Sequence, residues 1–277
     1  MRRARARALG AAALAIWAAA TSAAQPPPSL SPPALPFGAG ERVTMRITYA
    51  HLLAGRATVR VAAGEAHGRP LLRFITEARS QGLFAWLLRF RVDDRTVAAW
   101  DPATGCSVSI EKHLREGRAV RDQEVRFDRE AGFAHVDDRK IQERRFEVGP
   151  CPLDVLSALF VTRVRGVPES GRLELPVFDN GKRYTLGVQW LGRERLDLPA
   201  PLGKNTPTVI VEPLLVEGTG LFVKKGRLKI WLTDDARRLP VRMRSKVPIG
   251  SVSADLESYE PAGPAGPAGP AAGDPRP

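Results

Sequence analysis

The side chains that most often bind metals or transfer protons are scattered along this chain. The four histidines lie far apart, mostly beside predicted turns: His51, His67, His113 and His135. No His-Glu-x-x-His or comparable ligand spacing brings two of them to one face of a helix. We therefore predict no metal site and no cofactor, and we interpret the histidines as exposed turn residues.

Hydroxyl and carboxyl groups lack catalytic spacing as well. Ser157 follows Asp154 by three residues, which is ordinary helix spacing, and the Gly-x-Ser-x-Gly surroundings of a hydrolase nucleophile are missing. Three aspartate pairs stand where turns favour aspartate, without the spacing of an EF-hand: Asp93-Asp94, Asp137-Asp138 and Asp234-Asp235. The sequence predicts no catalytic residue, so an enzyme would need carboxylates that only folding brings together.

One uniformly apolar segment is a candidate for binding. Residues Gly82–Leu88 are apolar on every side, which suits either a buried strand or one helical turn. Such a segment forms part of the core or lines a groove. Phe84 and Trp86 within it are therefore candidate binding residues.

Trp231 and Lys229 are two further candidates. The apolar residues at even positions from 228 to 232 point to one face of a predicted strand, so Trp231 points to the opposite face beside Lys229. An indole among cations suits sugars, lipid interfaces or anionic groups. Exposed tryptophan is uncommon, however, and we expect another part of the chain, such as Pro199–Pro207, to cover this ring.

The two cysteines, Cys106 and Cys151, are predicted to form a disulfide because their number is even and the chain begins with an export signal. The Cys-x-x-Cys spacing of redox-active or metal-binding pairs is missing. Closing a loop of about 45 residues would stabilise the fold by roughly 4 kcal/mol in the chain-entropy model.

The export signal covers residues 1–24, where four arginines precede an apolar run and small residues precede Gln25. The run is shorter than the roughly 20 apolar residues that a membrane-spanning helix needs. We therefore predict a cleaved signal peptide and an exported, periplasmic protein without a membrane span. The four arginines account for four of the formal charge of +12, which leaves +8. This charge favours anionic envelope partners, but an ordinary solvated basic surface is the simpler interpretation. No nucleic-acid-binding motif is present.

Composition also divides the remaining chain. Residues 25–40 are rich in proline and predict an extended linker, and residues 261–277 repeat Pro-Ala-Gly and predict a disordered tail. Residues 41–260 between them suffice for a single β-rich domain.

Within this domain the clearest alternation of apolar and polar residues covers residues 224–260 and predicts three antiparallel strands. Asn180-Gly181 predicts a tight hairpin. A further hairpin is expected to turn at Asp93-Asp94. The one predicted helix begins at Cys151–Asp154 and ends at Arg165, before Gly166. These elements favour a mainly all-β fold, a curved antiparallel sheet forming a half-open or closed barrel with one short α-helix packed on it.

Four stretches carry a resemblance to a known family. They are Gly40-Glu41, Cys-Pro-Leu-Asp-Val-Leu-Ser at residues 151–157, Asp-Asn-Gly-Lys-Arg-Tyr at residues 179–184, and Ile-Trp-Leu-Thr-Asp-Asp at residues 230–235 with Arg-Arg-Leu-Pro-Val at residues 237–241. Over residues 40–259 the chain resembles the exported proteobacterial family called domain of unknown function 3108. The resemblance implies an envelope location and a β-rich fold, and it implies no reaction.

Two functional hypotheses follow. The first is a non-catalytic periplasmic binding or envelope-assembly module whose curved sheet offers a partly apolar concave surface to a lipid-like or glycan-like envelope component. The second is an envelope hydrolase whose carboxylates are assembled by the fold. A concave face that is open favours the first, and three acidic residues converging in a cleft favour the second.

Overall fold

A computed structural model of the chain describes residues 35–81, 91–138, 141–218, 228–246 and 250–263. These residues form one antiparallel sheet and one α-helix, α2 (Val155–Arg165). The strands are β1 (Arg42–Tyr49), β2 (Leu52–Ala66), β3 (Arg69–Ser80), β4 (Asp93–Asp101), β5 (Cys106–Glu116), β6 (Ala119–Asp128), β7 (Phe133–Asp138), β8 (Ile141–Glu147), β9 (Arg172–Asp179), β10 (Lys182–Leu196), β11 (Thr206–Gly218), β12 (Leu228–Thr233), β13 (Pro240–Lys246) and β14 (Ser251–Glu260).

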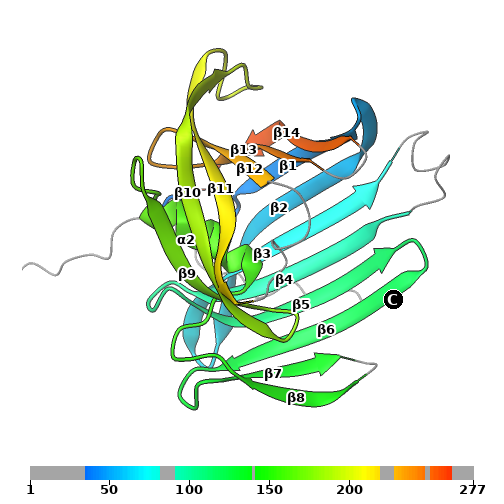
Figure 1. Cartoon of the computed structure of the whole chain (residues 1–277), viewed down its shortest axis with the longest axis vertical. Coiled ribbons are helices and arrows are strands. Elements are labelled where there is room, and N and C mark those ends of the chain that lie inside the picture. The colour runs from blue at the N-terminus through cyan, green and yellow to red at the C-terminus, as the bar shows by residue number, and fades with distance from the viewer. Residues whose placement is uncertain (1–34, 82–90, 139–140, 219–227, 247–249, 264–277) are drawn as a thin grey trace, which may run out of the picture. The chain divides into compact units, whose positions relative to one another are not determined.

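Strands that follow one another in the chain pair with one another, except β8 and β9, which stand at the two ends of the strand order. The strand order runs from β8 back to β1, then to β14, and from β14 back to β9. The β1–β14 pairing, in which Val43 lies opposite Tyr259, therefore joins two meanders into a single sheet. Figure 1 shows this sheet curving so that α2 lies between β9–β11 and the concave face of β3–β5. The all-β prediction with a curved sheet and one short helix is confirmed in this form.

Most of the predicted local structure is also confirmed. The segment 224–260 contributes β12, β13 and β14. The hairpin between β9 and β10 turns at Asn180 and Gly181, whose φ angles of 49° and 72° are the left-handed values that favour asparagine and glycine. The helix has Asp154 as its N-cap and Gly166 as its C-cap, with Arg163 and Arg165 in its last turn.

The hairpin predicted at Asp93-Asp94 is wrong, because these two residues are the first two of strand β4. Asp93 accepts a hydrogen bond from Nε of Arg79 at 3.1 Å, and Asp94 accepts one from the backbone N–H of Arg115 at 2.8 Å. These donors on neighbouring strands offset the low strand propensity of aspartate.

The main hydrophobic core packs one side of α2 against the concave face of the sheet. Its centre is aromatic: the rings of Phe74 and Phe160 stack with centroids 3.7 Å apart, and Phe37 meets Phe160 edge to face at 4.9 Å. Phe37 is only 5% exposed. Phe37, which the sequence places in the predicted linker 25–40, therefore packs as part of the folded domain.

A second hydrophobic cluster covers the opposite face of the sheet. It contains buried residues of β1, β12, β13 and β14 together with Leu196 at the end of β10, and Leu198 and Leu202 pack against it. Trp231 lies in this cluster, whereas Ile230 and Leu232 lie in the main core. Successive side chains of β12 therefore contribute to two apolar layers, and Trp231 belongs to the layer on the outer face of the sheet.

Candidate ligand cavity

A cavity of about 680 Å³ lies beside α2 inside the curved sheet. One wall is the helix, a second consists of β10 to β13, and a third comes from β3 to β6. Its volume falls within the roughly 300–1,000 Å³ of typical small-molecule sites. We take this cavity as the candidate functional site.

The helix divides the interior into a solid part and an open part. Val155, Ala158, Leu159 and Thr162 follow helical spacing and line the cavity. Phe160, between them in sequence, instead packs into the aromatic core. One side of α2 therefore anchors the helix to the sheet, and the other faces an unfilled space.

The wall formed by β10 to β13 is aliphatic. It consists of Leu186, Val188, Val211, Pro213, Leu228, Ile230, Leu232 and Met243. No aromatic side chain is among the described residues that line the cavity. Such a wall suits flexible apolar groups, because sugars and planar rings are usually held by aromatic faces.

The opposite wall changes from apolar to polar along β4 and β5, as the strand register shows. Ala98 pairs with Ile110, and two residues further along Thr96 pairs with Lys112. Beyond them, Asp94 of β4 and Leu114 of β5 also line the cavity. Leu114 in turn pairs with Arg121 on β6. The cavity therefore has an apolar interior and a polar end, and that end opens to solvent because Glu116, Arg121 and Asn180 line it while exposed.

Two polar contacts at this end join the two halves of the sheet. The ammonium of Lys112 on β5 donates to a carboxylate oxygen of Asp179 at the end of β9. Nη1 of Arg121 on β6 donates to the amide oxygen of Asn180 at 3.1 Å. The Lys112 side chain is 14% exposed and that of Asp179 only 6%. The pair is thus largely desolvated, and its attraction offsets the cost of desolvation only if the two groups keep a favourable geometry.

The segment before α2 bridges β5 and β9 by backbone hydrogen bonds. The Ser107 N–H donates to the carbonyl of Pro152 at 3.0 Å, the Leu153 N–H donates to the carbonyl of Pro176 at 3.0 Å, and the Phe178 N–H donates to the carbonyl of Leu153 at 2.8 Å. Pro152–Leu153 thus holds the edge strand β9 near the start of β5.

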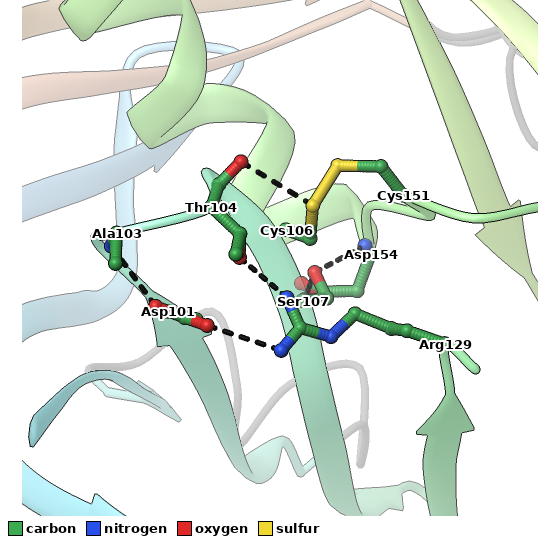
Figure 2. The surroundings of a disulfide bond; sticks show 8 residues. All are labelled: Asp101, Ala103, Thr104, Cys106, Ser107, Arg129, Cys151 and Asp154. Atoms are coloured by element: carbon green, nitrogen blue, oxygen red, sulfur yellow. Dashed lines mark hydrogen bonds and ion pairs between the residues drawn. A yellow bond between two sulfur atoms is a disulfide. The ribbon is translucent and has the colours of Figure 1, made fainter. Parts of the chain in front are cut away.

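The predicted disulfide is confirmed at this bridge. Cys106 and Cys151 are bonded, with Cα atoms 5.1 Å apart. Figure 2 shows the bond beside the start of α2, with Asp154 directed toward Ser107. The cross-link therefore joins the beginning of β5 to the segment that leads into the helix.

Asp154 fixes the first turn of α2. Its side chain accepts from the backbone N–H groups of Leu156 and Ser157, both at 2.9 Å, and from the hydroxyls of Ser107 at 2.7 Å and Ser157 at 2.6 Å. Ser157 is fully buried in this network. Its hydroxyl therefore serves the helix cap, and it is not presented to a substrate.

Asp101 pairs with Cys106 across β4 and β5, and its side chain contacts Ala103 and Arg129 beside the disulfide (Figure 2). Burial is the largest influence and on its own would raise the pKa of Asp101. Hydrogen bonds from Thr104, the Ala103 N–H and Arg129, together with the charge of Arg129, outweigh it and hold the pKa below its ordinary value. The Arg129 guanidinium lies 3.1 Å from the carboxylate.

Of the binding residues proposed from the sequence, the two that the structure describes, Trp231 and Lys229, do not line this cavity. Phe84 and Trp86 lie outside the described residues. Trp231 is 5% exposed and its Nε1 donates to Glu194 at 2.6 Å. Lys229 is exposed on the same outer face. Trp231 is thus covered by other parts of the chain, as expected, and offers little surface to a partner.

The histidines take two kinds of position. His51 and His67 are exposed in turns, with φ angles of 69° and 52°. The turn interpretation is wrong for His113 and His135, which lie in β5 and β7, and Nδ1 of His113 lies 2.9 Å from a carboxylate oxygen of Asp122. In the described part of the chain, no three His, Cys, Asp or Glu side chains gather into a metal site.

The cavity residues themselves escaped sequence reasoning. Alternation correctly turns Leu186, Val188 and Ile230 inward, but it does not distinguish a side chain that packs against another from one that borders a space. The helical spacing of Val155 and Leu159 carries the same limitation.

Among the described residues, no helix combines the length and apolar character required to cross a bilayer. Two comparisons with known proteins bear on fold and family. A crystal structure from Brucella abortus, described as a β-barrel-like protein of domain of unknown function DUF1849, matches with a TM-score of 0.52 and 12% identity. The match covers 80% of this chain and 97% of that one, and at this identity it supports the fold alone.

No curated protein matches the sequence. The model of the family described as protein of unknown function (DUF3108) matches residues 44–257. That range includes α2, the disulfide, all three walls of the cavity and most of the β1–β14 pairing. This chain therefore belongs to the DUF3108 family.

Proposed function

We propose that this protein is a non-catalytic binding module of the periplasm that holds a lipid-like amphiphile between α2 and the concave face of the sheet. The observation that carries the proposal is the cavity of about 680 Å³, aliphatic along α2 and β10–β13 and polar at its open end. Burying apolar surface there is favourable by about 25 cal/mol per Å², and the polar end leaves a head group in water.

Three features support the details. The aliphatic lining favours a lipid-like ligand over a glycan-like one. The disulfide suits an oxidising compartment outside the cytoplasm. A half-open sheet suits ligand entry, since β8 and β9 stand at opposite ends of the strand order.

The proposal is tested by identifying what the protein carries. The exported protein is purified from the periplasm, extracted with organic solvent, and the extract is analysed by mass spectrometry. We expect lipids in a defined molar ratio to the wild-type protein.

A matched pair of variants locates the binding site. Leu156→Trp places an indole in the cavity, and Leu191→Trp makes the same change at an exposed position on β10. Lipid should be lost from the first variant and kept by the second. Wild-type protein that carries no lipid, or equal lipid in the two variants, contradicts the proposal.

The hydrolase is the alternative, since Asp94, Glu116 and Asp179 all line the cavity. Asp179 is already paired with Lys112 and hydrogen-bonded to the side-chain amide of Asn180, and Asp94 accepts from the backbone of Arg115. Hydrolysis of ester or glycoside substrates that disappears in Asp94→Asn would favour this alternative over a binding module.

A further inference from the structure

A second cavity, of about 470 Å³, lies next to the first, toward the C-terminal end of α2. Val211 and Leu232 line both cavities. Val211 pairs with Ile230 and Leu232 pairs with Val209, so Val211 and Leu232 are diagonal neighbours on β11 and β12. They are 1% and 3% exposed. These two side chains therefore form a partition between the cavities.

The two spaces differ in chemistry. Charged side chains line much of the second cavity, alongside apolar ones such as Val167 and Val209. Among the charged ones is Arg193, which lies 2.6 Å from a Glu169 oxygen and 2.9 Å from an Asp234 oxygen. An alkyl chain that entered it would meet ion pairs and the water around them, and would gain little from burial. The apolar compartment therefore ends at Val211 and Leu232.

We infer that Val211 and Leu232 form the floor of the ligand site and set the longest apolar tail that it accepts. This inference rests on the proposed function, because it assumes that the apolar tail of an amphiphile enters the first cavity while the head group stays at the open end. Affinity rises with each methylene group until the tail reaches the floor. Beyond that length, further methylene groups stay in water and add nothing.

The test measures the dissociation constants of saturated fatty acids from octanoate to docosanoate by calorimetry, on the full exported chain and below their micelle concentrations. The partition variant is Val211→Ala with Leu232→Ala. The matched control is Val188→Ala with Ile230→Ala, two residues of similar size that line the first cavity only.

We expect the length at which affinity stops rising to increase in the partition variant and to stay at the wild-type value in the control. Each methylene that fills the space vacated by the two truncated side chains should tighten binding by up to about fourfold, which corresponds to about 0.8 kcal/mol. Methylene groups that pass beyond this space into the charged second cavity should add little. The same limiting length in all three proteins, or an equal shift in both variants, overturns the inference while leaving the proposed function intact.

Two safeguards keep the result decisive. If the circular dichroism spectrum of the double variant differs from that of the wild type, or its disulfide does not form, the single variants Val211→Ala and Val188→Ala are compared instead. Truncating one valine disturbs the core less. If the wild-type protein binds none of the fatty acids, the proposed function fails, and the inference about its length limit fails with it.

Discussion

At the scale of single residues, three side chains that resemble functional groups, those of Trp231, Ser157 and Asp154, are held in structural contacts. The indole of Trp231 is covered by the outer cluster and hydrogen-bonded to Glu194, and the guanidinium carbons of Arg242 and Arg244 lie 5.9 and 5.7 Å from its ring centroid. Ser157 and Asp154 bond to each other and to the helix backbone. A search by residue type alone therefore selects structural residues and misses the residues that line the cavity.

Replacing Trp231 by alanine should lower the free energy of unfolding by about 3 to 5 kcal/mol, the usual loss for a large buried aromatic side chain. Denaturant unfolding measures the change. Lys229→Ala, an exposed neighbour on the same strand, should stay within about 0.5 kcal/mol. Similar small losses for both variants would contradict the burial of the indole.

Asp101 should make the stability of the protein depend on acid through Arg129. The folded-state pKa of Asp101 is depressed, so its contribution is present above the unfolded pKa, about 3.9, and is lost as the pH falls through the folded value. Arg129→Met should therefore be less stable than wild type at neutral pH, with the difference shrinking in acid. Unfolding by denaturant over a pH series measures this difference.

The control for this experiment is Arg126→Met, which removes an exposed pair with Glu124. Its effect on unfolding should be small at every pH, because exposed pairs contribute little. A loss in Arg129→Met that stays constant from neutral pH to about pH 3 would show that Asp101 is not the titrating group.

At the scale of elements, α2 and the segment just before it, residues 151–154, organise the interior. This segment bridges β5 and β9 by backbone hydrogen bonds, the disulfide links it covalently to β5, and Asp154 caps the helix. One side of the helix then completes the aromatic core, and the other leaves the cavity open. The position of the cavity wall thus depends on a covalent bond outside the cavity.

Reducing the disulfide should destabilise the protein by about 4 kcal/mol if the loop-closure entropy dominates. Thermal unfolding with and without reductant measures the loss, and intact mass shows a gain of two hydrogens on reduction. The variant Cys106→Ser with Cys151→Ser serves as the control, because reductant should leave its unfolding temperature unchanged. An unfolding temperature that does not respond to reductant in the wild type would contradict a stabilising role for the bond.

Sequence patterns predicted these elements well and their surroundings poorly. Strand alternation, the caps of α2 and the Asn180-Gly181 turn are local signals, so they could be read from neighbouring residues. Asp93-Asp94 has the composition of a turn but lies in a strand, because its partners on Arg79 and Arg115 are distant in the chain. Leu186 and Phe74 carry the same inward signal, yet one borders the cavity and the other is fully packed.

At the scale of the whole molecule, contacts between distant parts of the chain hold the curved sheet together. Glu41, just before β1, receives two hydrogen bonds from Arg163 of α2, at 2.6 and 3.0 Å. Arg163 also donates to the carbonyl of Arg237 at 3.1 Å and lies 5.0 Å from the ring centroid of Phe37. One arginine thus joins the start of the sheet, the helix and the β12–β13 turn.

Arg163→Met should lower the free energy of unfolding by about 3 to 5 kcal/mol, because it leaves the Glu41 carboxylate buried without its partner. The side chains are 1% and 2% exposed. Adding Glu41→Leu to this variant should recover part of the loss. Chemical denaturation of the single and double variants measures the coupling.

Arg42→Met provides the comparison, since Arg42 and Glu260 form an exposed pair with side chains 47% and 64% exposed. This variant should lose at most about 1 kcal/mol. Losses of equal size for the buried and the exposed pair would contradict the structural role assigned to Arg163.

The β1–β14 pairing also sets an order of events in time. The ribosome makes β1 first and β14 last among the strands. Until β14 has been synthesised, one edge of β1 presents unpaired N–H and C=O groups, which is the usual template for pairing with a foreign chain. A nascent chain that stopped before Ser251 would keep that edge open, so complete synthesis is the condition for pairing this edge of β1. For that whole interval the growing polypeptide must be kept away from copies of itself.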